Sequence, residues 1–232
     1  MTREQKAYIA PFAAFMLLLA AIPLLPMLAP NAGSILSTAP QHVLFPLQTL
    51  ICGALLLVYW KSYALQRPAG IGFTLAIAIL IFAIWISPQW LFLAPRRFEG
   101  FDPTLFQTRP AVYAAVLALR FLRLVVVVPL LEEIFWRGFL LRDFIDRDFK
   151  KVPFGTFSPF SFGAVTLLFA FAHWGSNGWR PGPDFIPALF AGTLFNVVAY
   201  RTRSLSSCVI AHAATNLLLG LYIMQTRQWG FW

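Results

Sequence analysis

Charged side chains are scarce in this 232-residue chain. Asp, Glu, Lys and Arg make up 12% of it, whereas 59% of the residues are hydrophobic. A soluble domain usually carries about 25% charged residues. A water-soluble core of this length could not hide so much apolar surface, so lipid is the expected solvent. The 24 Phe and 8 Trp are typical of a membrane protein with aromatic anchors at the interfaces.

Acidic residues are also few. Asp and Glu number 9 against 18 Lys and Arg, which gives a net charge of +9. In a soluble protein this excess would suggest nucleic-acid binding. Here the basic residues lie mostly between apolar segments, so we expect them to set membrane topology, and we expect no nucleic-acid partner. They include Lys61, Arg67, Arg96, Arg97, Arg201 and Arg203.

The two cysteines, Cys52 and Cys208, both lie in apolar stretches. This setting favours small core residues over a disulfide framework or a metal-binding pair. The sequence also contains no His-Glu-x-x-His pair for zinc and no evident Ser or Cys nucleophile set. If the protein is a hydrolase, carboxylates are the remaining candidates for its catalytic groups.

Long apolar runs dominate the rest of the chain. Because a transmembrane helix needs about 20 apolar residues, the sequence predicts an all-α, polytopic membrane helical bundle of seven or eight transmembrane helices. We find no internal repeat, low-complexity tract or soluble domain. The fourth run is too long for one simple crossing, and it is either one long tilted helix or two helices broken near Arg120 and Arg123. The expected spans are roughly Tyr8–Ala29, His42–Trp60, Gly70–Ala94, Ala111–Leu141, Phe160–Trp174, Asp184–Tyr200 and Leu205–Met224.

The basic loops predict an orientation. Arg3 and Lys6 precede the first span and place the N-terminus in the cytoplasm. The same two residues would suit a cleaved signal peptide, but the apolar run is too long for one and leads into further spans. Alternate crossings then place three further basic loops inside and leave one loop as an exception outside. The inside loops hold Lys61 and Arg67, Arg142–Lys151, and Arg201 and Arg203; the exception holds Arg96, Arg97 and Arg109.

Two adjacent acids follow an apolar run in the fourth span. An ionisable group at membrane depth is costly, so it usually has a partner or faces a cavity. Glu133 and Arg137 are four residues apart on one helix face, with the acid first, and can neutralise each other. Glu132 has no cation at that spacing and is left available for chemistry. The alternative is that both acids lie at the interface and simply end a helix.

Later spans supply two imidazoles and an amide. Phe169 and His173 lie late in one apolar run, and His212 and Asn216 lie four residues apart in the last run. This spacing places His212 and Asn216 on one face, where both can donate hydrogen bonds to one oxygen. Counted from the loops, the three groups reach about 12–20 Å into the membrane, so they could converge on one cavity open to the cytoplasm. The alternative to a functional role is that His173 is a structural residue and that His212 and Asn216 only hold neighbouring helices together.

Taken in order, these motifs resemble those of a known family. Glu-Glu-x-x-x-Arg, Phe-x-x-x-His and His-x-x-x-Asn on successive membrane helices are similar to the CAAX-protease and bacteriocin-processing (CPBP) intramembrane proteases, over roughly Arg120–Met224. Residues 1–110 would then be transmembrane helices without a motif, and residues 111–232 the catalytic core. The C-terminal stretch resembles an exosortase-associated, CAAX prenyl protease-related bacterial subgroup. That implies the bacterial inner membrane, an exosortase-system partner and a substrate without a prenyl group.

The resemblance implies a glutamic endopeptidase acting on a peptide or protein substrate without a cofactor. Glu132, helped by His173, would activate water, and His212 with Asn216 would hold the oxyanion; Glu133, Arg137 and Phe169 would support them. One alternative is a zinc protease with Glu132, His173 and His212 as ligands. Others are a non-enzymatic scaffold or immunity-type protein, and a transporter, although the chain lacks the repeated halves that transporters often show.

Overall fold

The computed structural model describes residues 2–28, 35–175 and 182–232. Within these ranges the regular structure is entirely helical, and the predicted polytopic membrane bundle is confirmed. Six helices are long and apolar enough to cross a membrane. They are Arg3–Met27, Gln41–Val58, Ile71–Trp90, Pro110–Asp143, Phe185–Thr202 and Leu205–Thr226. The predicted end of the first span, Ala29, lies outside the described residues.

The remaining predicted span is short. Helix α9 runs from Pro159 to Phe171 and has 13 residues, so it falls below the length of a full crossing. Its start follows from local chemistry. Ser158 caps the helix, its Oγ accepting a hydrogen bond from Ser161 N at 3.3 Å, and Pro159 fits the first turn, which needs no N–H donor.

The long fourth run is one continuous helical stretch, Pro110–Asp143, and it is not broken into two helices near Arg120 and Arg123. It changes winding rather than breaking. Helix α6 (Pro110–Leu122) passes into a π-helical stretch, η4 (Arg123–Val127). Helix α7 (Val128–Glu133) passes into a second one, η5 (Ile134–Leu140), before α8 (Leu141–Asp143). π-Helical turns are rare and occur frequently at functional sites.

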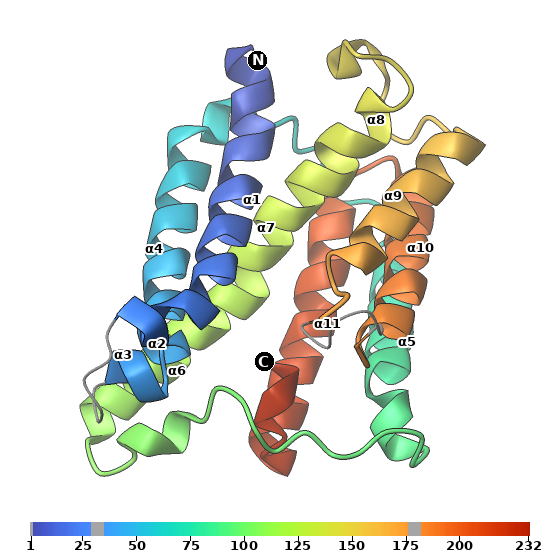
Figure 1. Ribbon diagram of the computed structural model, residues 1–232. Coiled ribbons are helices and arrows are strands. Elements are labelled where there is room, and N and C mark those ends of the chain that lie inside the picture. Colours follow the sequence, from blue (N-terminus) through green and yellow to red (C-terminus); the bar gives the residue numbers. More distant parts are fainter. Residues whose placement is uncertain (1, 29–34, 176–181) are drawn as a thin grey trace. The chain divides into compact units, whose positions relative to one another are not determined.

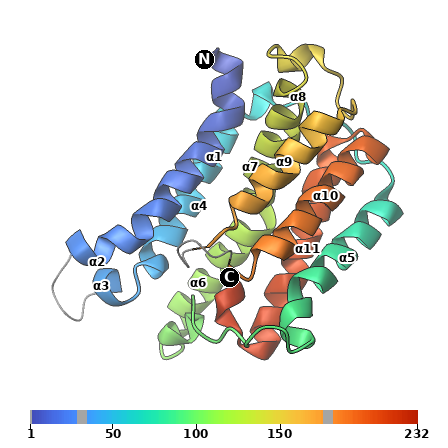
Figure 2. The ribbon, with the colours of Figure 1, turned by 45° about the vertical axis from the view of Figure 1, so that its right-hand side comes forward.

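The chain forms two compact units. Unit 1 consists of Met1–Tyr63, Arg97–Leu131 and Gly220–Trp232, and unit 2 of Ala64–Arg96 and Glu132–Leu219. In unit 1, α1 (Arg3–Ala21) lies beside α4 (Gln41–Val58) (Figures 1 and 2). Gln48 on α4 joins the pair, its Nε2 donating to Phe15 O at 2.7 Å. The shorter elements of unit 1 include η1 (Ile22–Leu24), α2 (Leu25–Leu28), α3 (Ile35–Thr38), η2 (Trp60–Ser62), η3 (Pro103–Phe106) and η7 (Trp229–Phe231).

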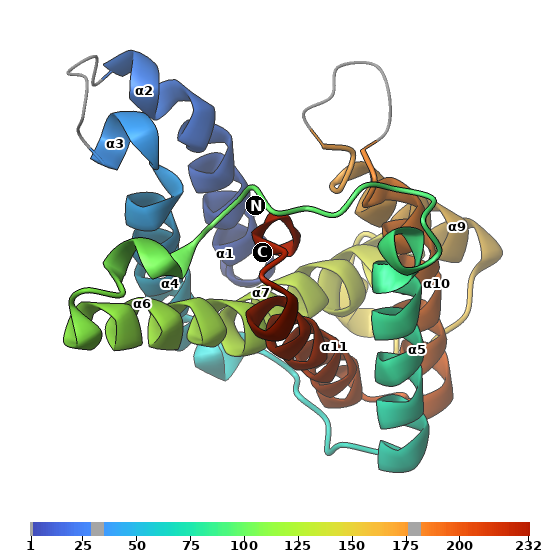
Figure 3. The same cartoon turned by 90° about the horizontal axis from the view of Figure 1, so that it is seen from below.

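Unit 2 contains every residue of the predicted site. Its helix α10 (Phe185–Thr202) packs against both α9 and α5 (Ile71–Trp90), as the views from the side and from below show (Figures 1 and 3). Most of α11 (Leu205–Thr226) belongs to this unit as well. Residues 1–110 thus contribute to both units, and the sequence-based division at residue 110 stays a prediction about which part carries the chemistry.

Three basic loops meet at one end of unit 2. Leu205 N donates to Gln66 Oε1 at 2.9 Å, and a Cβ placed on Gly155 would lie 2.8 Å from Arg203 Cγ. The loops before α5, before α9 and between α10 and α11 are therefore neighbours. They hold Arg67, Arg147, Lys150, Lys151 and Arg203, and Arg201 lies in the last turn of α10. This clustering agrees with the prediction that these loops share one side of the membrane.

Candidate active site

A buried ion pair lies where α7 passes into η5. Arg137 Nη1 donates to Glu133 Oε1 at 3.1 Å, and both side chains are 0% exposed. The pair predicted from the four-residue spacing therefore forms. Full burial makes the pairing important, because either charge alone would be left without water or a counter-ion.

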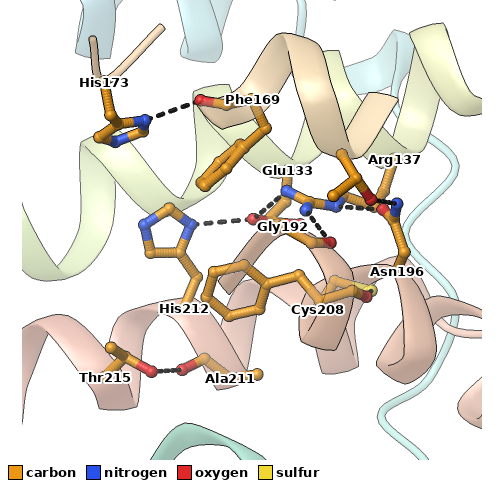
Figure 4. Close-up of polar contacts among 12 residues, drawn as sticks. Glu133, Arg137, Phe169, His173, Gly192, Asn196, Cys208, Ala211, His212 and Thr215 are labelled. Carbon is orange, nitrogen blue, oxygen red and sulfur yellow. Dashed lines mark hydrogen bonds and ion pairs between the residues drawn. The ribbon is translucent and has the colours of Figure 1, made fainter. Parts of the chain in front are cut away.

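The other donors of Arg137 reach α10. Arg137 Nε donates to Asn196 Oδ1 at 3.1 Å, and Nη2 donates to Gly192 O at 3.0 Å (Figure 4). Asn196 in turn donates from Nδ2 to Thr166 Oγ1 on α9 at 3.1 Å. One guanidinium thus fixes the acid-bearing helix to two neighbouring helices of unit 2.

His212 on α11 contacts the same carboxylate. Its Nδ1 lies 2.8 Å from Glu133 Oε1. Because an ionised carboxylate only accepts hydrogen bonds, Nδ1 carries a proton, and Nε2 is the ring atom left for other chemistry. The ring stacks on Phe195, with 4.9 Å between the centroids. The contact between Glu133 and His212 was not predicted from the sequence.

Glu132 lies beside this network without joining it. Its side chain is 7% exposed, and its Oε2 is buried with no hydrogen bond from the described residues. A buried carboxylate oxygen without a donor is costly, and such groups usually mark an ordered water or a ligand. Glu133 Oε2 is also buried without a donor. The two adjacent acids differ in that Glu133 is held through Oε1 by a cation and an imidazole, whereas Glu132 forms no hydrogen bond or ion pair with the described residues.

His173 lies two residues beyond the end of α9, so it follows the helix in which it was expected. Its Nδ1 is 2.8 Å from Phe169 O. A carbonyl can only accept, so Nδ1 again carries the proton and Nε2 is left. The ring lies beside Phe169 at 4.8 Å and meets the edge of Trp85 on α5 at 5.6 Å between centroids.

Phe169 links the two histidine environments. Its ring centroid lies 4.9 Å from Arg137 Cζ, and Phe195 lies 5.2 Å from the same atom. The ring therefore supports the buried cation. In Figure 4 the imidazoles of His173 and His212 lie on the same side of the Phe169 ring. A Cβ on Gly192 would lie 3.2 Å from Phe169 Cδ1, so this close approach of α9 and α10 leaves little room for a side chain.

Asn216 lies one turn after His212 on α11 and is half-buried. The preceding residue anchors this part of the helix: Thr215 Oγ1 is 3.1 Å from Ala78 O on α5 and 3.0 Å from Ala211 O. The register of α11 against α5 is thereby fixed, and with it the face that carries His212 and Asn216.

Sequence reasoning missed Asn196 and Thr166. Both are polar residues inside predicted spans, Asp184–Tyr200 and Phe160–Trp174. The argument that singled out Glu132 and the histidines, that a polar group at membrane depth needs a partner, applies to Asn196 equally well. Applied to every polar residue in a predicted span, this argument would have singled out Asn196.

The zinc alternative can be compared with this geometry. Across residues 2–28, 35–175 and 182–232, no three His, Cys, Asp or Glu side chains are grouped so that they could hold a metal ion. Glu132, His173 and His212, the proposed ligands, are therefore not gathered as a ligand set.

Comparison with known proteins points to one family. Residues 114–218 match the family model described as type II CAAX prenyl endopeptidase, Rce1-like. No curated protein and no solved structure matches the chain. The matched segment contains all three motifs, from Glu132 to Asn216. Residues 114–218 of this integral membrane protein are thus similar to the Rce1-like CAAX prenyl endopeptidases, and this match supports the CAAX-protease family that the motifs predicted.

Proposed function

We propose that this protein is an intramembrane endopeptidase that hydrolyses a peptide bond in a protein substrate with Glu132 as the water-activating carboxylate. The family match supports the reaction class. The observation that carries the choice of residue is the contrast between the adjacent acids. Both acids have a buried Oε2 without a donor, but Glu133 Oε1 is bonded to Arg137 and His212, whereas Glu132 forms no hydrogen bond or ion pair with the described residues.

The other residues take roles that fit their contacts. A general base must accept a proton from water, and His173 has Nε2 left for this because Nδ1 is used by Phe169 O. We assign His173 to assist Glu132. His212 and Asn216 lie one turn apart on α11 and are assigned to the oxyanion that forms on attack. His212 Nε2 can donate to that oxyanion when both ring nitrogens carry a proton, and Nδ1 lies 2.8 Å from Glu133 Oε1.

The substrate is proposed to approach from the cytoplasmic side of a bacterial inner membrane. The basic loops gathered at one end of unit 2 support that orientation. The matched family model is named for prenylated CAAX substrates, whereas the exosortase-associated resemblance favours a substrate without a prenyl group. We propose the second class, together with an exosortase-system partner.

Comparative proteomics tests the function. Cells producing wild type, Glu132→Gln or the control Asp148→Asn are compared for uncut precursors; Asp148 is an exposed acid paired with Lys151. We expect a precursor to accumulate with Glu132→Gln alone, while the thermal stability of the purified variant stays near wild type. Equal processing in all three strains would refute the assignment. Cleavage of a synthetic prenylated CAAX peptide by the wild type alone would retain the protease and overturn the proposed substrate class.

A further inference from the structure

Unit 1 contains a buried arginine that the proposed proteolysis does not use. Arg120 on α6 is 2% exposed, and its Nε, Nη1 and Nη2 are all buried without a hydrogen bond to the described residues. A guanidinium stays protonated in proteins. A buried positive charge without hydrogen-bonding partners is costly, so this side chain indicates a missing anion.

Aromatic rings surround the guanidinium but do not supply that anion. Arg120 Cζ lies 4.4 Å from the centroid of Phe45, 4.9 Å from that of Phe101 and 5.0 Å from that of Trp232. Such cation–π contacts are favourable. They leave the in-plane N–H donors of the guanidinium without acceptors. Such donors can bind an oxyanion through two parallel hydrogen bonds.

A second cation lies close by. Arg123 Cζ is 4.4 Å from the same Phe45 ring, and its Nε donates to Gln48 Oε1 at 2.7 Å. The acid next to Phe101 is engaged elsewhere, since Asp102 Oδ1 accepts from Thr104 N at 2.9 Å and from Thr104 Oγ1 at 2.7 Å. Two positive charges therefore share one aromatic surface.

Both arginines line one small pocket. It lies between α4, α6 and Phe101, and its walls include Arg120, Arg123 and the apolar residues Pro46, Val116 and Leu119. We propose that this pocket binds a phosphate group, carried by an anionic phospholipid or present as the free ion. Arginine forks match phosphate oxygens, and basic pockets between membrane helices bind anionic headgroups.

The position of the rings supports a headgroup. Arg120 is about 15 Å along the helix axis from Pro110. Its guanidinium nevertheless contacts Phe101, which lies in the connection between the spans Ile71–Trp90 and Pro110–Asp143. The long side chain thus reaches back toward the membrane boundary, where phosphates lie. The apolar wall beside it suits the glycerol and acyl portion of a lipid.

The test uses the full chain, purified in a neutral detergent and stripped of lipid. Melting temperatures are measured with phosphatidylglycerol, with phosphatidylcholine and with inorganic phosphate, for wild type, Arg120→Gln and Arg109→Gln. Arg109 is an exposed arginine that precedes α6, so its variant removes the same charge outside the pocket. We expect phosphatidylglycerol to raise the wild-type melting temperature by about 3 °C or more relative to phosphatidylcholine.

The measurements distinguish a phospholipid headgroup, a free phosphate ion and the absence of binding. A rise with inorganic phosphate that phosphatidylglycerol does not produce would identify the free ion. Either rise should vanish in Arg120→Gln and persist in Arg109→Gln. No rise in either arm, or an equal rise in Arg120→Gln, overturns the proposal. If Arg120→Gln does not fold, Arg120→Lys keeps the charge without the fork, and native mass spectrometry should then show at least about tenfold less retained phospholipid; equal retention overturns it. None of these results depends on peptidase activity.

Discussion

Asn196 Oδ1 accepts a hydrogen bond from Arg137 Nε across 3.1 Å, so α10 holds the cation that pairs with Glu133. Glu133 in turn contacts His212 on α11. The order of contacts, from Asn196 through Arg137 and Glu133 to His212, allows the structural and chemical roles of each residue to be separated by substitution.

Glu133→Ala should mainly reduce stability. The change leaves Arg137 buried without its carboxylate, and breaking a buried ion pair costs about 3–5 kcal/mol. We expect the melting temperature in detergent to fall by about 10 °C, whereas Glu132→Ala, which removes no hydrogen bond or ion pair among the described residues, should stay near wild type. A well-folded but inactive Glu133→Ala would show instead that Glu133 acts in the chemistry, through His212.

Asn196→Leu should reduce stability by a smaller amount. It removes the acceptor of Arg137 Nε and the donor to Thr166 Oγ1. A hydrogen bond to a charged group contributes about 1.5–3 kcal/mol, so we expect a loss of about that size in thermal or denaturant unfolding. Thr193→Val is the matched control on α10, because among the described residues the Thr193 hydroxyl donates to Leu189 O of its own helix and to no other helix. Equal losses in the two variants would contradict the role given to Asn196.

His212→Gln separates donation from proton acceptance. The glutamine amide can donate a hydrogen bond but cannot act as a base. If His212 stabilises the oxyanion as proposed, His212→Gln should retain a measurable fraction of the cleavage rate and His212→Ala should lose about 10²–10³-fold. Equal inactivity of both variants, with melting temperatures near wild type, would favour proton acceptance at Nε2 instead.

Chelation tests the role of a metal directly. We expect purified protein treated with EDTA, then assayed on the precursor found by proteomics, to cleave at the untreated rate. Loss of activity that Zn²⁺ restores, together with about one zinc per chain by elemental analysis, would reinstate the alternative with Glu132, His173 and His212 as ligands.

The membrane bundle was predictable because apolar length dictates it, and every predicted span has a helix in the described residues. The details depended on tertiary packing. The 13-residue length of α9 could not be foreseen, since the apolar run continues past Phe171 to Trp174. The π-helical stretches were also missed. A regular helix was assumed, and no periodicity in an almost wholly apolar run marks a change of winding.

Within the site, spacing along one helix predicted the pair of Glu133 and Arg137, because residues four apart share a face. Contacts between helices were less accessible. Nothing in the sequence indicates that His212 bonds to Glu133 and not to Glu132, since that choice depends on the rotation of α7 and α11 about their own axes. The pairing of Arg137 with Asn196 on α10 depends on the same rotations, although Asn196 itself could have been singled out as a polar residue inside a predicted span.

The winding of η5 has a consequence for insertions and deletions. Each π-helical turn closes a hydrogen bond over one residue more than an α-turn does. Deleting one residue between Glu133 and Arg137 would therefore let the stretch wind as an ordinary helix, with little change in its apolar length. Residues three apart on an α-helix share a face as residues four apart do, so the guanidinium would still face the acid. The extra residue of a π-helical turn can therefore be removed without separating this pair.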